Sequence, residues 1–180
     1  TLRMLEGKNI VFFDPFYRDL SRYIILPIIN TLLSNKKCLF IVGRNSAKKD
    51  VENWLTEILY EYVKIESLWK VSELGHSEPD CEVGIMGFTS IYDSDIMDAN
   101  KSFFSEVGFV FVLEASLIVN TGQIGLSIIS SMIEEHNKDA VYCVADRIAD
   151  GLVDTLSHIF QKEFIEVAAP PISKNLHSYV

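Results

Sequence analysis

The chain has 180 residues, of which 48% are hydrophobic and 23% are charged, and this size suits one domain with a substantial core better than two. Its formal net charge of -9 comes from acidic residues spread along the sequence, which argues against a domain that grips a polyphosphate backbone alone. No apolar run reaches the roughly eighteen residues of a membrane span and no signal pattern opens the chain, so we expect a soluble, cytoplasmic protein without a membrane partner.

Short apolar runs alternate with segments of helical periodicity along the whole chain. The runs are hydrophobic almost without interruption, as strands covered on both faces must be, so they predict a largely parallel sheet. The expected elements, in chain order, are a strand at 9–13, a helix at 20–33, a strand at 37–42, a helix at 46–62 with Ser46 as its N-cap, strands at 82–88 and 108–114, a helix at 118–135, a strand at 140–145, a helix at 149–161 and a strand at 164–168. Residues 68–71 can add another short strand, and residues 73–81 are expected to form a polar loop.

This alternation predicts an α/β fold, a doubly wound and mainly parallel sheet with helices on both faces. We expect one domain over residues 1–180, with 170–180 as the segment most suited to a linker. The sequence opens on Thr1 without an initiator methionine. A piece excised from a longer chain would look like this, and so would a processed start.

Cysteine and histidine are placed in ways that disfavour a metal site or a disulfide framework. Cys38, Cys81 and Cys143 are an odd number at wide spacing, with no CxxC pair. Cys38 and Cys143 lie inside apolar runs and are predicted to be core residues. The four histidines show no spacing typical of a ligand set or a nucleophile site, and surface or helix-end positions are expected for them: His76, His136, His158 and His177.

Residues that follow the predicted strands are the first place to look for function, because open parallel sheets bind ligands outside the carboxyl ends of their strands. The first such stretch, residues 14–27, reads DPFYRDLSRYIILP. It resembles motif I of superfamily 2 helicases, including the DEAD-box group, in which a strand leads into a phosphate loop A-P-T-G-S-G-K-T and then into a helix reading L-x-x-L-L-P. Without any gap, Pro15 matches the proline of that loop and Ser21 matches its final threonine.

The resemblance continues in the order of the family's motifs. Residues 39–46 look like the strand and motif Ia that contact nucleic acid backbone, and residues 83–92 are similar to the strand that ends in GTPGRL. Residues 109–116 stand in the place of the Walker B strand and its DEAD or DEAH box, and Asp146 stands in the place of the motif III threonine. The resemblance covers nearly the whole chain and implies the N-terminal RecA-like lobe, a P-loop NTPase fold, with candidate nucleic-acid contacts at Arg44, Asn45 and Thr89.

The same resemblance implies that the ATP-hydrolysing motifs are degenerate. Tyr17 and Asp19 stand at glycine positions of the phosphate loop and Leu20 at its lysine position, so the groups that would hold phosphates are missing. Leu113 stands at the magnesium-directing aspartate of Walker B, which leaves Glu114 as a remnant without its metal partner. We therefore expect no intact catalytic residue, no metal and no cofactor. The degenerate nucleotide-binding positions are Pro15, Tyr17, Asp19, Leu20 and Ser21.

Three functions remain open. The first is a noncatalytic, helicase-like pseudo-ATPase domain that serves as scaffold or interaction module in a larger nucleic-acid-processing protein. Its partner would be a second RecA-like lobe or another protein domain, with weak or indirect nucleic acid binding. The alternative is the nucleotide-binding lobe of an ATP-dependent helicase or translocase, which would use ATP and Mg²⁺ and need a second lobe. A Rossmann-like or flavodoxin-like small-molecule or signalling module ranks third, because no G-x-G-x-x-G follows a strand.

Two further alternatives concern particular residues. Residues 26–57 also resemble the opening of a helicase's second lobe, but Glu114-Ala115 and the loop proline favour the first. Ser116 follows a predicted strand end, where a nucleophile could stand, but it lacks the G-x-S-x-G elbow that would expose it, so we expect no catalysis there.

Overall fold

The structure, a computed structural model, describes residues 9–13, 20–63, 69–136, 141–145 and 151–168. Within these residues, seven strands form one parallel sheet in the order β3-β4-β2-β5-β6-β1-β7. The strands are β1 (Asn9–Phe13), β2 (Lys37–Val42), β3 (Val71–Glu73), β4 (Val83–Gly87), β5 (Val107–Val112), β6 (Val141–Ala145) and β7 (Phe164–Ala168). Every observed strand pair is parallel, as the uninterrupted apolar runs predicted.

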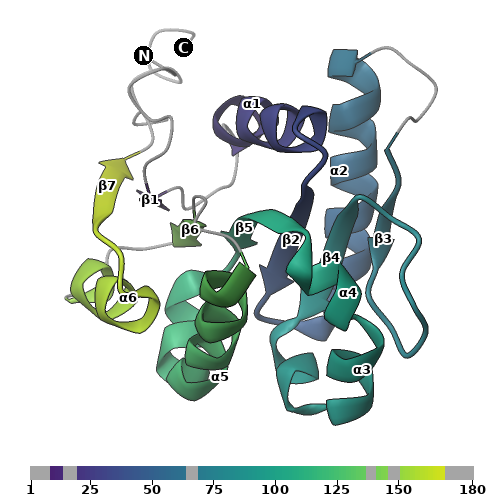
Figure 1. Ribbon diagram of the computed structural model, residues 1–180. Helices are drawn as coiled ribbons and strands as arrows, with labels where there is room; N and C mark the ends of the chain where they lie inside the picture. The colour runs from purple at the N-terminus through teal and green to yellow at the C-terminus, as the bar shows by residue number, and fades with distance from the viewer. Residues whose placement is uncertain (1–8, 14–19, 64–68, 137–140, 146–150, 169–180) are drawn as a thin grey trace, which may run out of the picture.

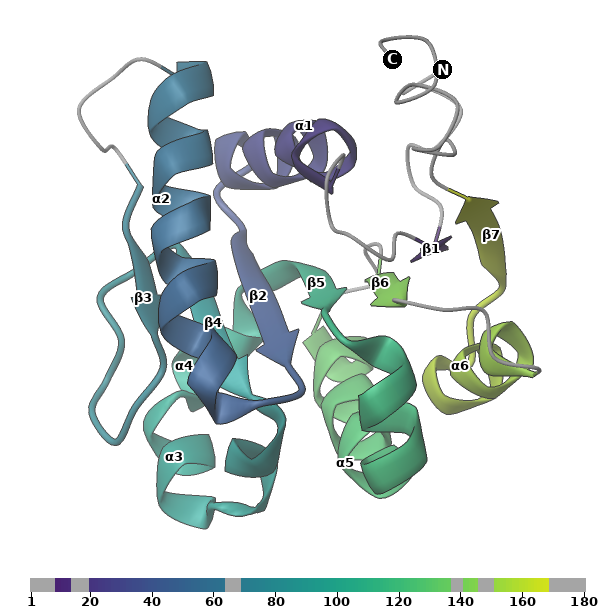
Figure 2. The same cartoon turned by 180° about the vertical axis from the view of Figure 1, so that it is seen from behind.

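Helices connect the strands and cover both faces of the sheet (Figures 1 and 2). Helices α1 and α2 pack on one face, and α5 and α6 pack on the other. The described helices are α1 (Leu20–Leu33), α2 (Lys48–Val63), α3 (Ser94–Ala99), α4 (Lys101–Ser105), α5 (Ala115–His136) and α6 (Leu152–Phe160), with 3-10 turns η2 (Asn45–Ala47) and η3 (Phe88–Tyr92). The predicted doubly wound α/β architecture is confirmed.

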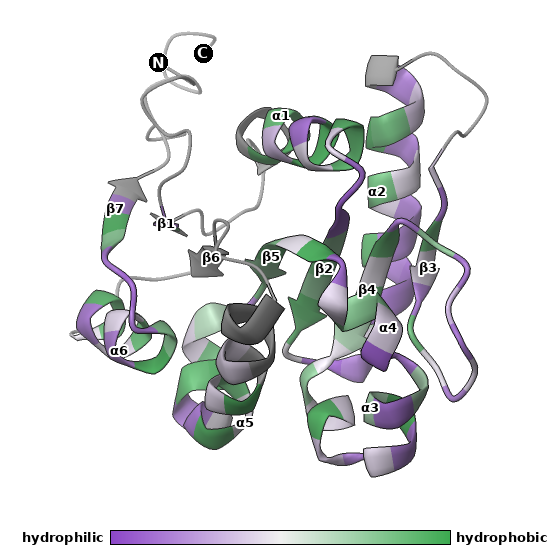
Figure 3. Ribbon diagram, viewed as in Figure 1, coloured by the Kyte–Doolittle hydropathy of each residue, from purple (hydrophilic) through white to green (hydrophobic). Residues whose placement is uncertain are grey.

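Strand β2 shows why nearly every residue of a central strand is hydrophobic. Cys38 and Phe40 belong to the core on the side of α1 and α2, whereas Leu39 and Ile41 belong to the core on the side of α5 and α6. All four side chains are fully buried. Figure 3 shows the contrast with α2, in which hydrophilic and hydrophobic bands alternate because one side of that helix faces solvent.

Predicted boundaries agree with the structure for β1, β2, β7 and α1 and shift by a few residues for most other elements. The prediction that Ser46 caps α2 is wrong, because α2 begins at Lys48, whose backbone N–H donates to the carbonyl oxygen of Asn45 in the preceding 3-10 turn. The short strand expected at 68–71 lies instead at 71–73. The strand begins at Val71 because its pairing with β4 begins there, with Val71 opposite Val83.

Two short helices, α3 and α4, were not predicted. They follow one another between β4 and β5, and the phenylalanines of α4, Phe103 and Phe104, are buried in the core on the side of α5. The tryptophans Trp54 and Trp69 are partly buried against the opposite core. Cys38 is buried as predicted, and the side chain of Cys143 lies outside the described part of the structure.

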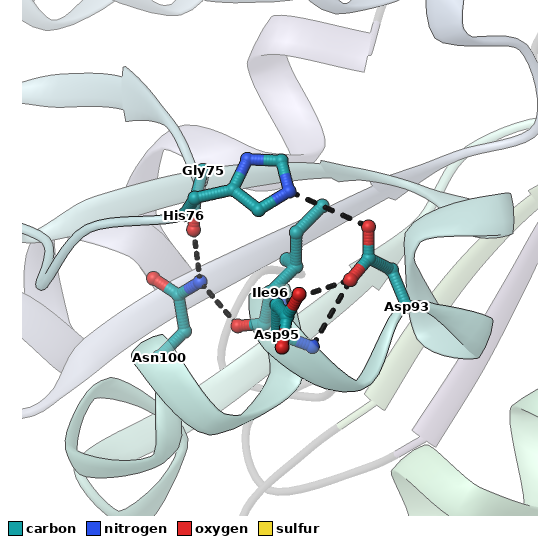
Figure 4. A network of polar contacts seen from close by, with 6 residues as sticks. All are labelled: Gly75, His76, Asp93, Asp95, Ile96 and Asn100. Atoms are coloured by element: carbon teal, nitrogen blue, oxygen red, sulfur yellow. Dashed lines mark hydrogen bonds and ion pairs between the residues drawn. The ribbon is translucent and has the colours of Figure 1, made fainter.

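The loop that follows β3 is held to α3 by polar contacts (Figure 4). Asn100 is fully buried, and its side-chain amide donates to the carbonyl oxygens of Gly75 (2.8 Å) and Ile96 (2.7 Å). Asp93 caps α3 by accepting from the backbone N–H groups of Asp95 and Ile96, and its other oxygen lies 3.5 Å from His76 Nε2. The loop expected over 73–81 is thus anchored by side chains that lie beyond it in sequence.

Candidate functional site

The carboxyl ends of β4, β2 and β5 lie side by side, because these strands are neighbours in the parallel sheet. Thr89 follows β4, Arg44 and Asn45 follow β2, and Glu114 follows β5. All four residues were identified from the sequence, in three motifs that are far apart along the chain. The strand order places them at one edge of the sheet, where parallel sheets bind their ligands.

Two side-chain contacts join these residues into a row. Asn45 Nδ2 donates to Thr89 Oγ1 at 3.0 Å. Arg44 Nε donates to Glu114 Oε2 at 2.8 Å, a charge-assisted hydrogen bond of short length. We call Thr89, Asn45, Arg44 and Glu114 the strand-end row. It brings together the three predicted nucleic-acid contacts and the carboxylate of Glu114, and the functions assigned to them stay predictions.

Two glycines at the strand ends allow these close approaches. A Cβ atom on Gly87, the last residue of β4, would lie 1.8 Å from Asn45 Oδ1. A Cβ atom on Gly43 would lie 3.1 Å from Leu117 Cδ2 and 3.2 Å from Glu114 Cβ. A side chain at Gly87 would therefore displace Asn45, and one at Gly43 would press on the start of α5.

Glu114 turns the chain from β5 into α5 through a left-handed backbone conformation, with φ of 58°. Such a φ is uncommon for a residue other than glycine and is found at tight turns and functional sites. On its N-terminal side, Leu113 is 5% exposed and belongs to the core beneath α1 and α2. On its C-terminal side, Ser116 is also buried, and its Oγ has no hydrogen-bond partner among the described residues.

The structure does not test the predicted phosphate-loop positions. Pro15, Tyr17 and Asp19 lie outside the described residues, as does Asp146. Leu20 and Ser21 form the first turn of α1, and only their backbone is described. Their proposed degeneracy therefore stays a prediction from the sequence.

Other chemistry-bearing side chains do not form a second site in the described part of the chain. No group of three or more His, Cys, Asp and Glu side chains there is placed to hold a metal ion. Burial raises the pKa of the Cys81 thiol to about 11, with the Lys37 ammonium opposing this shift in part, and burial also raises the pKa of Cys38. Both thiols stay protonated near neutral pH and are poor nucleophiles. Within the described segments, no helix is both long and apolar enough to cross a membrane.

Several basic side chains between Lys36 and Lys49 pair with acidic residues. Lys37 Nζ lies 3.4 Å from Glu106, and Lys49 Nζ lies 3.3 Å from Glu52. Together with the Arg44–Glu114 pair, these contacts give an acidic partner to three of the five basic residues in this stretch.

Asp93 and Asn100 are structural polar residues that the sequence analysis missed. Asp93 had a signal, because an aspartate followed by Ser94 and Asp95 is a frequent start of a helix. Asn100 had none, since its two acceptors come from a loop and from the preceding helical turn.

No protein-family model and no curated protein sequence matches the chain. Solved structures do match it. Over 91% of its length the chain matches "DUF1998 helicase MrfA", with a TM-score of 0.72 and 14% identity, and it covers 28% of that protein. Over 93% of its length it matches DEAD-box helicase Mss116 bound to ssRNA and UDP-BeF, with a TM-score of 0.70 and 16% identity, and it covers 38% of that protein. Over 92% of its length it matches a hypothetical ATP-dependent RNA helicase from Sulfolobus tokodaii, with a TM-score of 0.66 and 18% identity, and it covers 49% of that protein.

The chain spans less than half the length of each of these three proteins. At such low identity the likeness concerns the fold, and it extends over nine tenths of the chain. The chain therefore has the fold of a RecA-like helicase lobe.

Proposed function

We propose that this chain is a noncatalytic, helicase-like domain, a pseudo-ATPase that serves as scaffold or interaction module within a larger nucleic-acid-processing protein. The observation that carries the proposal is the chemistry at the end of β5. Where a helicase of the resembling family places the carboxylate that directs Mg²⁺, this chain has Leu113, an apolar side chain packed into the core. A leucine offers no oxygen to a hard cation.

The surroundings of Leu113 support the proposal further. Its backbone N–H donates to the carbonyl oxygen of Ile41 at 2.8 Å, so it extends the β5 ladder onto β2. The adjacent carboxylate of Glu114 accepts from Arg44. Phosphoryl transfer to water uses a residue that orients the attacking water beside the metal, and here the carboxylate at that position has a cationic partner within the chain.

The sequence of the phosphate loop points the same way. With Tyr17, Asp19 and Leu20 at the glycine and lysine positions, an ATP phosphate would lose a charge-assisted contact worth about 1.5–3 kcal/mol for each missing donor. No cofactor is therefore proposed. The proposed partner is a second RecA-like lobe or another protein domain, because the chain covers only 28–49% of the length of the solved helicases that share this fold.

Calorimetry decides between this proposal and the alternative of a nucleotide-binding motor lobe. Titration of ATP with Mg²⁺ into the full 180-residue chain should give no heat of binding at physiological ATP concentration. A dissociation constant in the low micromolar range would overturn the pseudo-ATPase proposal. The matched comparison is a variant that restores the motifs, carrying Tyr17→Gly, Asp19→Gly, Leu20→Lys and Leu113→Asp.

That variant should melt below the parent, because Leu113→Asp places a carboxylate among buried apolar side chains. A variant that melts as high as the parent and also gains ATP binding would mean that a nucleotide crevice is still formed. The lost site would then be open, not a closed surface available for protein contact.

A further inference from the structure

Glu114 is the Walker B remnant, and its side chain is bound to Arg44. The Glu114 side chain is 17% exposed, whereas that of Arg44 is 66% exposed. The carboxylate is therefore held in place by its surroundings, and the guanidinium reaches it from the surface. Of the two partners, Glu114 is the one whose position the fold determines.

The backbone fixes this position from both sides. β2 and β5 pair up to Ile41 opposite Val112, and Leu113 extends the ladder by donating to Ile41. Glu114 then turns the chain through its left-handed φ, and its Cβ lies beside Gly43, which has no side chain to crowd it. The residues after the two strands are thus brought opposite one another by main-chain pairing, not by the mobility of two long side chains.

We propose that Glu114 acts as the built-in counter-ion of Arg44 and keeps this arginine from contacting a phosphodiester backbone. The inference rests on the proposed noncatalytic function, since a glutamate that oriented a hydrolytic water could not also serve this role. A phosphate that approached Arg44 would compete with a carboxylate 2.8 Å from Nε and would be repelled by its charge. In this proposal Glu114 positions the Arg44 side chain, and Arg44 could contact an anion only if Glu114 released it.

The chain contains a matched control pair. Lys49 and Glu52, on the first turns of α2, form an ion pair at 3.3 Å with side-chain exposures of 67% and 21%. Glu52→Gln removes one negative charge of similar burial, a few residues from Arg44 in sequence, without touching the strand-end row. It therefore reports the general effect of a less acidic surface.

The experiment is fluorescence anisotropy of labelled single-stranded oligo-dT with the full chain over a range of salt concentrations. The parent and Arg44→Ala should bind equally weakly. Glu114→Gln should bind about fivefold more tightly, the effect of removing one unit charge about 4 Å from a phosphate in water. Its log–log salt slope should steepen by about 0.7, as for one additional phosphate contact on a single strand.

Two comparisons test whether the gain acts through Arg44. The double variant Arg44→Ala/Glu114→Gln should lose it, and Glu52→Gln should show less than half of it. The inference is overturned if Glu114→Gln does not bind more tightly, if the double variant keeps the gain, if Glu52→Gln matches it, or if Arg44→Ala alone weakens the parent. The last test uses an exposed side chain, so it stays informative if Glu114→Gln fails to fold.

The salt slope separates this inference from the proposed function. ATP binding by the parent would overturn the pseudo-ATPase proposal whatever the oligonucleotide result. An unchanged slope in Glu114→Gln, together with absent ATP binding, would overturn only the role given to Glu114.

Discussion

Gly122 interrupts α5, and replacing it with alanine should destabilise the protein through one contact. At this residue the backbone leaves the helical region, with φ of -164° and ψ of 58°. Such an extended φ suits any residue, so the cost comes from the new Cβ. It would lie 2.1 Å from Cζ of Phe88, a ring that is only 5% exposed and stacks edge-on against Tyr92. Ordinary carbon contacts are about 3.5–4.0 Å, so the ring must move by more than 1 Å.

We therefore expect Gly122→Ala to lower the free energy of unfolding by about 1–3 kcal/mol, the usual cost of overpacking. Urea unfolding followed by circular dichroism measures it. Gly75→Ala is the control, because a Cβ there meets no atom within 4 Å. Phe88→Leu shortens the ring and should remove most of the Gly122→Ala penalty in a double-mutant cycle.

Either of two results would refute this reasoning. One is a Gly122→Ala variant within about 0.5 kcal/mol of Gly75→Ala, the range of ordinary surface substitutions. The other is an undiminished penalty in the Phe88→Leu background. In both cases the kink in α5 would have a cause other than the aromatic ring that fills it.

Four further predictions concern polar side chains and thiols. Asn100→Ala should lower the free energy of unfolding by about 1–3 kcal/mol, since the carbonyl of Gly75 loses its side-chain donor and that of Ile96 keeps only the backbone N–H of residue 100; a loss below about 0.5 kcal/mol would show that other donors replace the amide. Asp93→Ala should cost about 1 kcal/mol in urea unfolding and Asp93→Asn only a few tenths, because asparagine also caps helices; equal losses would contradict the capping role. In a Cys143→Ala background at pH 8, Cys38 and Cys81 should react with Ellman's reagent far more slowly than in urea, and rapid reaction of the folded protein would contradict their burial. Burial raises the pKa of the Cys81 thiol from 9.0 to about 11 in the folded state. The protonated thiol therefore makes its full contribution to stability below pH 9, and this contribution should be lost as pH rises toward 11. Over that range the urea midpoint of the parent should fall more than that of Cys81→Ala.

The parallel sheet could be predicted from the sequence because its central strands are covered on both faces. Residues 109–112 read Phe-Val-Phe-Val without a polar interruption, and alternate residues enter the two cores. A strand exposed on one face would have shown alternation instead. Helix α1 could be located because its hydrophobic residues recur at helical spacing, and these residues pack on β2 and β5.

The short helices α3 and α4 could not be predicted, because six and five residues are too few to show a helical period. Their stability comes from Phe103 and Phe104, which are buried by tertiary contacts. The kink of α5 was hidden for a related reason. Gly122 lies within a segment of helical periodicity, and only the ring of Phe88, more than thirty positions earlier, requires a residue without a side chain there.

The residues of the strand-end row were found from the sequence, but their pairing was not. Arg44 and Glu114 are separated by 70 positions, and Asn45 and Thr89 by 44. Each was selected because it follows a strand. Which residues meet depends on the order of β4, β2 and β5 in the sheet, and that order is not contained in any local pattern.

The place of β1 in the sheet bears on how the chain is made. Ile10 pairs with Tyr142 on one side and Ile165 on the other, both more than one hundred residues later in the sequence. During synthesis, β1 leaves the ribosome before the other strands of the sheet, yet its two neighbours are the last of them to emerge. Contacts of such long separation form slowly, and an unpaired apolar strand is prone to aggregate in the meantime. A fragment that ends before β6 would leave β1 without either neighbour, so a shortened chain must still reach through β7 to complete the sheet around it.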